Sequence, residues 1–208
     1  MSTAFNSNQL KTICDGLAND GYVLIDEAFP AAFITDLLHQ VQGKDTGEFN
    51  SAGIGRAADF QTNSQIRSDE ILWLDENRAE NQSYFIWVET LRLALNQQFY
   101  LGLSEYECMF AHYPVGAFYQ KHLDAFKPVG NSKGSNRKVS TILYLNPNWQ
   151  PDDGGELLLY REGQEQPFKR ILPDLGKLVV FLSGEFPHEV LPAKKSRYSL
   201  TGWFRTLI

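Results

Sequence analysis

The chain has 208 residues, 43% of them hydrophobic and 13% aromatic, so it can bury a sizeable core, and we expect one domain spanning residues 1–208. Lysine and arginine number 19 against 25 aspartates and glutamates, and the net charge of −6 argues against nucleic acid as the main partner. Two cysteines are too few for a disulfide framework, and the lack of a signal peptide or of about 18 consecutive apolar residues predicts a cytoplasmic protein with no membrane partner.

The first part of the chain, about residues 1–105, is predicted to be mainly helical, because apolar residues recur there at the spacing of amphipathic helices. The expected helices are Leu10 to Leu17, Phe33 to Val41 and residues 82–99, and the expected strands are Tyr22 to Ile25 and residues 66–75. Residues 43–60 are rich in glycine and predict a long loop. We expect the helices to cover a sheet.

The second part, about residues 106–208, changes to short β-like runs separated by turns. The expected strands are residues 106–113, 117–124, 138–146, 155–160, 178–183, 187–191 and 196–205. Short strands at regular spacing predict a β-sandwich or barrel. A loop rich in glycine, serine and asparagine is expected from Lys127 to Lys138.

Two side chains suited to a metal lie close together in the run from Tyr119 to Phe126. Side chains two residues apart on a strand point to the same face, so one metal ion could bind both His122 and Asp124. His188 follows in a later β-like run. Two neutral imidazoles and one carboxylate form the facial triad that suits non-haem Fe(II) and leaves positions open for other ligands. Zinc accepts the same donors, so the ligands alone do not identify the metal.

Arg197 supplies the second half of the predicted site. Strand alternation places Arg197, Ser199, Thr201 and Trp203 on one face. On an inward face, Arg197 can form a two-pronged ion pair with a carboxylate while Thr201 donates a further hydrogen bond. Each motif alone has a structural alternative, since a His-x-Asp triplet occurs by chance and Arg197 could pair with an acidic residue of the chain. Their combination favours a metal centre beside an anion anchor.

Several blocks of sequence carry a family pattern over about residues 60–205. In chain order they are Tyr113-Pro-Val-Gly, Phe118-Tyr-Gln-Lys-His-Leu-Asp124, Ser140-Thr-Ile-Leu-Tyr-Leu-Asn146 with Trp149, Gly154-Gly-Glu-Leu-Leu158, Pro187-His-Glu-Val190 and Arg197-Tyr-Ser-Leu-Thr201. This pattern resembles the prolyl 4-hydroxylase family of Fe(II)- and 2-oxoglutarate-dependent dioxygenases, in particular the hypoxia-inducible factor prolyl hydroxylases and their bacterial homologues. The resemblance implies a mainly β fold with flanking helices: a double-stranded β-helix (jelly roll) core supported by the N-terminal helices.

Carried over by position, the resemblance implies roles for individual residues. His122, Asp124 and His188 would bind Fe(II), and Arg197 would pair with the distal carboxylate of 2-oxoglutarate. The other expected contacts are Tyr144, Tyr113 and Thr201 to the cosubstrate, and Arg137 and Arg67 near a peptide substrate. The structural alternatives are core side chains for the first three and solvated basic residues for the two arginines. With Tyr113 facing inward, its neighbour His112 is expected to be a structural or outer-face residue.

The function implied is a dioxygenase that uses Fe(II), 2-oxoglutarate and dioxygen, with ascorbate as reductant. It would hydroxylate a proline in a protein or peptide substrate while 2-oxoglutarate is decarboxylated to succinate, and the bacterial homologues suggest a translation elongation factor as target. Two alternatives stay open: a hydroxylase of a free amino acid, for which a closed, narrow pocket is expected, and a non-catalytic metal-binding jelly-roll module. The sequence carries no signal for an oligomeric state.

Overall fold

In the computed structural model, residues 7–44, 46–53, 63–125 and 135–207 are described. Within them two antiparallel sheets form. The major sheet has the order β1-β9-β6-β11-β4-β3-β2 and the minor sheet the order β5-β10-β7-β8. The strands of the major sheet are β1 (Tyr22–Ile25), β2 (Asn50–Ser51), β3 (Glu70–Trp73), β4 (Leu103–Tyr113), β6 (Arg137–Tyr144), β9 (Leu178–Leu182) and β11 (Arg197–Thr206). Those of the minor sheet are β5 (Tyr119–His122), β7 (Leu157–Leu159), β8 (Lys169–Ile171) and β10 (His188–Val190).

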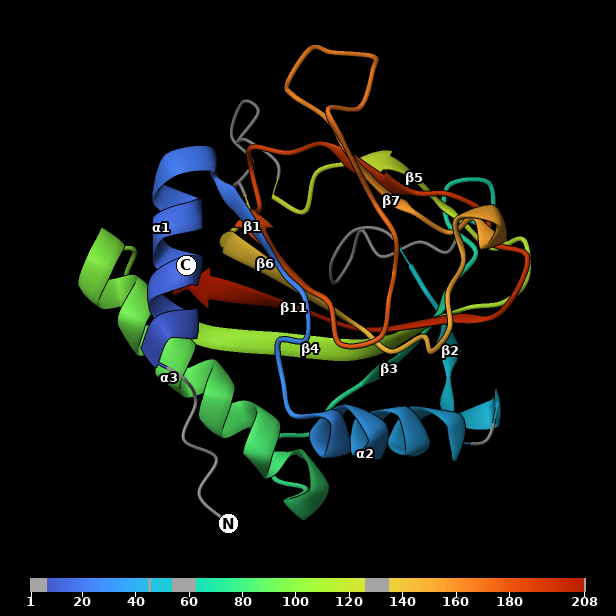
Figure 1. Cartoon of the computed structure of the whole chain (residues 1–208), viewed down its shortest axis with the longest axis horizontal. Helices are drawn as coiled ribbons and strands as arrows, with labels where there is room; N and C mark the ends of the chain where they lie inside the picture. Colours follow the sequence, from blue (N-terminus) through green and yellow to red (C-terminus); the bar gives the residue numbers. More distant parts are fainter. Residues whose placement is uncertain (1–6, 45, 54–62, 126–134, 208) are drawn as a thin grey trace.

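Three α-helices of the described residues lie along one side of the major sheet, while β5 and β7 lie on its other side (Figure 1). They are α1 (Ser7–Asp20), α2 (Ala31–Gln42) and α3 (Gln82–Phe99), and short 3-10 turns occur at Thr46–Glu48, Ala79–Asn81 and Pro151–Asp153. A glycine directly follows α1: Gly21 has a φ of 77°, and its amide donates to the carbonyl of Leu17.

Two apolar clusters follow from strand alternation. The helix-side core joins the helices to one face of the major sheet, and its members include Ile13, Leu37, Trp87, Leu91, Leu95, Phe110, Leu143, Leu200 and Phe204. The inter-sheet core fills the space between the sheets and includes Met109, Tyr113, Ile142, Tyr144, Leu157, Phe181 and Trp203. Along β4, Phe110 thus faces the helices, while Met109 and Tyr113 face the minor sheet.

The predicted elements agree with this fold apart from four local differences. The strand expected over residues 66–75 is limited to β3, and the strand expected over residues 117–124 ends at His122. The edge strand β8 was not predicted, because three residues are too short to show an alternating pattern. The expected loop over residues 43–60 contains a 3-10 turn and β2, and its residues 45 and 54–60 lie outside the described residues, as do residues 127–134 of the second expected loop.

None of the helices in the described part of the chain combines the length and apolarity that a membrane span needs.

Candidate metal and cosubstrate site

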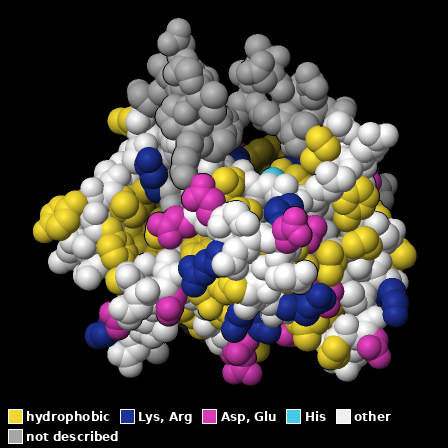
Figure 2. Space-filling view, turned by 90° about the horizontal axis from the view of Figure 1, so that it is seen from above, with side chains coloured by type: hydrophobic (Ala, Val, Ile, Leu, Met, Phe, Trp, Pro, Cys, Tyr) yellow, Lys and Arg dark blue, Asp and Glu magenta, His cyan; other side chains and the backbone are white. Residues whose placement is uncertain are grey.

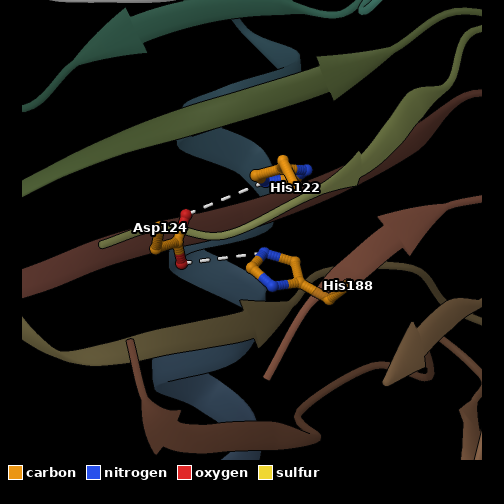
Figure 3. Close-up of side chains that lie close together, drawn as sticks. All are labelled: His122, Asp124 and His188. Atoms are coloured by element: carbon orange, nitrogen blue, oxygen red, sulfur yellow. Dashed lines mark ion pairs between the residues drawn. The ribbon is translucent and has the colours of Figure 1, made fainter. Parts of the chain in front are cut away.

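Three potential metal ligands converge at the edge of the minor sheet. His122 is the last residue of β5, His188 is the first residue of β10, and the two residues are paired across these antiparallel strands. The carboxylate of Asp124 faces both imidazoles, with 3.8 Å from its Oδ1 to Nε2 of His122 and 3.7 Å from its Oδ2 to Nε2 of His188 (Figure 3). One ligand atom from each of the three residues lies within 4.8 Å of the others, which is close enough for one ion to bind all three.

Asp124 reaches this position differently from the sequence prediction. We expected it to share a strand face with His122, but β5 ends at His122 and Asp124 lies in the bend that follows. Its Oδ2 instead accepts a hydrogen bond of 2.7 Å from the hydroxyl of Ser140, on β6 of the major sheet. The expected convergence is therefore correct, although strand alternation is not its cause.

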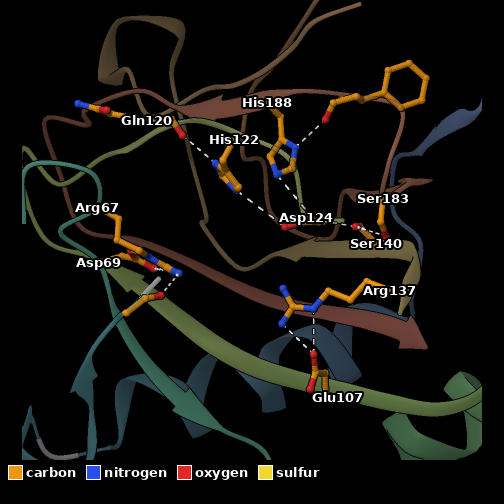
Figure 4. A network of polar contacts seen from close by, with 12 residues as sticks. Arg67, Asp69, Glu107, Gln120, His122, Asp124, Arg137, Ser140, Ser183 and His188 are labelled. Carbon is orange, nitrogen blue, oxygen red and sulfur yellow. Dashed lines mark hydrogen bonds and ion pairs between the residues drawn. The ribbon is translucent and has the colours of Figure 1, made fainter. Parts of the chain in front are cut away.

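Backbone carbonyl groups orient both imidazoles. Nδ1 of His122 lies 2.7 Å from the carbonyl oxygen of Gln120, and Nδ1 of His188 lies 2.9 Å from that of Phe186 (Figure 4). An Nδ1–H that donates to a carbonyl leaves Nε2 with a free lone pair, which is the arrangement found in metal-binding histidines. Tyr119 stacks on His122 with ring centres 3.5 Å apart and so supports one face of that ring.

The environment favours the protonation states that a metal requires. Burial, together with the adjacent His188, lowers the pKa of His122 to about 3, so this imidazole is neutral near pH 7. Burial alone would raise the pKa of Asp124, but the two imidazoles, Arg137 and the hydrogen bond from Ser140 outweigh it and hold that pKa at about 2. An ionised carboxylate beside a neutral imidazole is a donor set that binds a divalent cation without first losing protons.

Arg197 lies in the same region as a buried cation. Its side chain is 1% exposed, and its Cζ lies 4.8 Å from the ring centre of Tyr113 and 5.0 Å from that of Tyr144. Nε donates to the carbonyl of Gly155 at 2.9 Å, and among the described residues no carboxylate forms a salt bridge with the guanidinium. A buried charge without a counter-ion is costly, so the site fits an anionic ligand.

Tyr144 places a further buried polar group next to Arg197. Its hydroxyl oxygen is buried, and although the guanidinium of Arg197 lies near enough to influence its pKa, the hydroxyl forms no hydrogen bond of normal geometry with the described residues. Burial outweighs the nearby charge of Arg197 and raises the pKa of Tyr144 to about 12, so the hydroxyl keeps its proton and can donate. Burial raises the pKa of Tyr113 as well, even against the charges of Arg67 and Arg197. A carboxylate placed against Arg197 would supply the acceptor that Tyr144 lacks.

One cavity of about 1020 Å³ joins the candidate metal ligands to Arg197, whereas Tyr144 contacts Arg197 but is not among the described residues that line the cavity. Its lining includes the three candidate ligands with Arg197, Tyr113, Thr201, Arg67 and Arg137. Ser199, Thr201 and Trp203 line it as well, which confirms the predicted inward face of β11. In the view from above, part of a histidine side chain is visible near hydrophobic side chains at the edge of a hollow (Figure 2).

The two arginines expected near a substrate are not free solvated residues. Arg67 is 8% exposed, donates to both oxygens of Asp69 at 2.8 and 2.6 Å and lies over the ring of Tyr119. Arg137 donates to Oε1 of Glu107 at 2.9 and 2.8 Å and lies 3.5 Å from the ring centre of Trp203. The solvated alternative is therefore wrong for both residues, while their contact with a substrate stays a prediction.

His112 lies away from the metal ligands, as expected. It is half-buried on the helix side of β4, where its ring stacks on Tyr198 at 4.6 Å and its Nδ1 lies 3.1 Å from a carboxylate oxygen of Glu70. These contacts support the structural role that was predicted for it.

Comparisons with known proteins agree with this geometry. A model of the 2OG-Fe(II) oxygenase superfamily matches residues 108–205. Egl nine homolog 1 of Mus musculus is 31% identical over 176 residues, which cover 77% of this chain and 40% of that protein. The hypoxia-inducible factor prolyl hydroxylase of Caenorhabditis elegans is 34% identical over 149 residues, which cover 67% of this chain and 20% of that protein. The chain thus spans less than half the length of these two relatives.

Two solved structures are similar over nearly the whole chain. A prolyl-4-hydroxylase of Pseudomonas putida superposes with a TM-score of 0.83 and 40% identity, covering 96% of this chain and 100% of that one. A prolyl hydroxylase of Trichoplax adhaerens, in complex with a peptide fragment of hypoxia inducible factor, has a TM-score of 0.81 and 29% identity, covering 95% and 89%. The chain belongs to the 2OG-Fe(II) oxygenase superfamily, and within it to the prolyl hydroxylases.

Proposed function

We propose that this chain hydroxylates a prolyl residue of a protein, using the Fe(II), 2-oxoglutarate and dioxygen that its family implies. The observation that carries the proposal is the pairing of two features in one cavity: a cluster of two histidines and one aspartate, and the buried, unpaired Arg197. When bound, Fe(II) and 2-oxoglutarate supply the oxidising power, and the chain supplies orientation and shielding from water.

Each group of the site has a distinct task in this proposal. His122, Asp124 and His188 hold Fe(II) through the atoms that already face one another. Arg197 binds the distal carboxylate of 2-oxoglutarate with its two terminal nitrogens, since its Nε is already bonded to Gly155. The hydroxyl of Tyr144 donates to the same carboxylate.

Two further groups complete the proposed cosubstrate pocket. Tyr113 packs against the guanidinium of Arg197 and excludes water from it, and Thr201 offers a hydroxyl in the cavity wall. Held at both ends, 2-oxoglutarate would have little freedom to leave or rotate, which favours reaction in one geometry.

A polypeptide substrate fits the cavity better than a free amino acid does. The volume of about 1020 Å³ exceeds what one amino acid beside 2-oxoglutarate requires, and the lining runs from Asn50 on β2 to Arg205 on β11. Arg67 and Arg137 also line it and lie on opposite sides of Asp124 in Figure 4, each fixed by a carboxylate. The Trichoplax adhaerens relative is itself described in complex with a peptide. These observations support an extended peptide segment as the substrate.

The proposal can be tested with the purified chain and a bacterial cell extract. The chain is incubated with Fe(II), ascorbate and 2-oxoglutarate, and peptides that gain one oxygen atom are identified by mass spectrometry, with a purified translation elongation factor as one candidate target. Asp124→Ala is the matched control because it removes one metal ligand. We expect proline-containing peptides to gain oxygen, with succinate formed in step, and no gain with the control.

Two other outcomes would each support one of the alternative functions. Succinate formed in step with oxidation of a free amino acid, and no modified peptide, would identify a small-molecule hydroxylase. No decarboxylation of 2-oxoglutarate by metal-loaded protein would indicate a non-catalytic binding module.

A further inference from the structure

Asp124 is the one candidate metal ligand that its own strand does not position. His122 and His188 belong to β5 and β10, which are hydrogen-bonded to each other, whereas Asp124 follows the end of β5. Its side chain is nevertheless 8% exposed and closely held. The groups that hold it come from the major sheet.

Two buried serines supply this support, one on β6 and one directly after β9. The hydroxyl of Ser140 lies 2.7 Å from Oδ2 of Asp124 and 2.8 Å from the hydroxyl of Ser183 (Figure 4). Both serines are fully buried. The carbonyl of Ser183 also accepts the amide N–H of Ala125 at 3.1 Å, so Ser183 fixes the backbone next to Asp124 as well.

The number of hydroxyl hydrogens determines which group donates in each of these hydrogen bonds. An ionised carboxylate only accepts, so the single hydroxyl hydrogen of Ser140 goes to Asp124. Ser140 can then act only as an acceptor toward Ser183, whose hydroxyl hydrogen points to it. Ser183 is held in turn, because its amide N–H donates to the carbonyl of Lys138 at 3.0 Å. Ser183 thus donates to Ser140, and Ser140 donates to Asp124, so that both hydroxyl hydrogens are used.

We infer that Ser140, supported by Ser183, is a positioning residue that orients the Asp124 carboxylate toward the metal, so that the triad is completed across the two sheets. The inference rests on the proposed function in that the three ligands bind a metal. Groups that hydrogen-bond to metal ligands commonly change metal affinity by about 10- to 100-fold. Loss of the Ser140 hydroxyl should have an effect of this size, and loss of the Ser183 hydroxyl a smaller one because the bond to Asp124 remains.

The test compares Ser140→Ala and Ser183→Ala with Thr141→Val. Thr141 is the matched control, since it is the next residue on β6, equally buried, and its hydroxyl bonds to Tyr106 on the helix side at 2.7 Å. Binding of Co(II) is measured by calorimetry without oxygen, and the visible spectrum of bound Co(II) reports on its donor set. Thermal unfolding of the metal-free variants shows whether each one folds.

We expect Ser140→Ala to bind Co(II) roughly 10- to 100-fold more weakly with an altered spectrum, Ser183→Ala to show a smaller loss, and Thr141→Val to be less stable but to bind normally. Parental affinity and spectrum in Ser140→Ala would overturn the inference, as would an equal loss in Thr141→Val. Should Ser140→Ala fail to fold, parental binding by Ser183→Ala would overturn it. Because no turnover is measured, a parental protein that binds Co(II) yet hydroxylates nothing would refute the proposed function and leave this inference standing.

Discussion

Arg197 is the residue whose surroundings most restrict what the site can bind. It is buried between two aromatic rings and has no acidic partner among the described residues, so its charge is compensated only when an anion enters the cavity. The two-pronged guanidinium matches a carboxylate in shape as well as in charge, which a lysine ammonium does not.

Replacing Arg197 should therefore weaken 2-oxoglutarate binding. Hydrogen bonds to a charged group contribute about 1.5–3 kcal/mol, so Arg197→Ala is expected to raise the dissociation constant of 2-oxoglutarate by roughly tenfold to a hundredfold. Arg197→Lys, which keeps the charge, should lose less. Calorimetry on the Mn(II)-loaded protein measures both, with Mn(II) affinity as the control. An unchanged response of Arg197→Ala to 2-oxoglutarate would show that its assigned role is wrong.

Removing the hydroxyl of Tyr144 is predicted to have opposite effects on stability and on 2-oxoglutarate binding. This buried hydroxyl forms no hydrogen bond of normal geometry with the described residues, and a buried unsatisfied polar group costs about 1–3 kcal/mol. Tyr144→Phe should therefore raise the melting temperature of the ligand-free protein by about 2–4 °C per kcal/mol, and it should weaken 2-oxoglutarate binding. Scanning calorimetry and a binding titration check the two effects.

Tyr84→Phe is the matched control for Tyr144→Phe. Tyr84 is equally buried, but its hydroxyl lies 2.8 Å from that of Tyr106, so removing it should lower stability and leave 2-oxoglutarate binding unchanged. If Tyr144→Phe were destabilising like this control and still bound 2-oxoglutarate normally, Tyr144 would be a core residue only.

At the scale of the elements, hydrogen bonds to the carboxylate of Glu107 connect three strands of the major sheet. Glu107 on β4 accepts hydrogen bonds from Arg137 on β6 and from Arg205 on β11. Burial alone would raise the pKa of Glu107, but the two arginines outweigh it and lower that pKa below its ordinary value. A carboxyl with a lower pKa in the folded state stabilises the fold above its ordinary pKa, and this contribution is lost as the pH falls.

Glu107→Gln should consequently be destabilising at pH 7 and nearly neutral in acid. Glu107→Gln leaves the half-buried guanidinium of Arg137 without its carboxylate partner and leaves Arg205 with Glu105 alone, which should cost about 1–3 kcal/mol at pH 7. The difference in melting temperature between parent and variant should shrink as the pH falls below about 4, the ordinary pKa of glutamate. Glu105→Gln is the control, because Glu105 is more exposed and, within the described part of the chain, forms an ion pair with Arg205 alone. A difference that is constant from pH 7 to acid would exclude the electrostatic explanation.

Strand alternation allowed part of the site to be predicted from the sequence. Along β11, a long and regular strand, it correctly placed Arg197 and Thr201 on the cavity face. It failed at β5, which ends before Asp124, and the carboxylate of Asp124 is instead hydrogen-bonded to Ser140, a residue of another strand. The partners of buried polar groups come from distant segments, and a single sequence carries no periodic signal for such pairs.

At the scale of the whole molecule, one core packs the helices on the major sheet, and the other core surrounds the candidate site. The helix-side core joins the three helices to the major sheet and contains none of the candidate site residues. The inter-sheet core contains Tyr113, Tyr144 and Trp203 and surrounds the cavity. Large side chains such as Trp87 and Leu91 are fully buried on the helix side, so most of the fold does not depend on what occupies the cavity.

The fold should therefore survive removal of the metal, and ligands should add stability in proportion to their concentration. A chelator is expected to leave the far-ultraviolet circular dichroism spectrum unchanged. Mn(II) with 2-oxoglutarate at about one hundred times its dissociation constant should add about 2.7 kcal/mol, which corresponds to roughly 5–10 °C in melting temperature for a chain of this size.

Asp124→Ala is the control for this ligand effect, because its cavity keeps Arg197 but has lost one metal ligand. It should show little stabilisation by Mn(II), and the shift in the parental protein should grow with ligand concentration as mass action requires. Loss of secondary structure on chelation would mean that the metal holds the two sheets together, and an equal shift in Asp124→Ala would mean that the ion binds elsewhere.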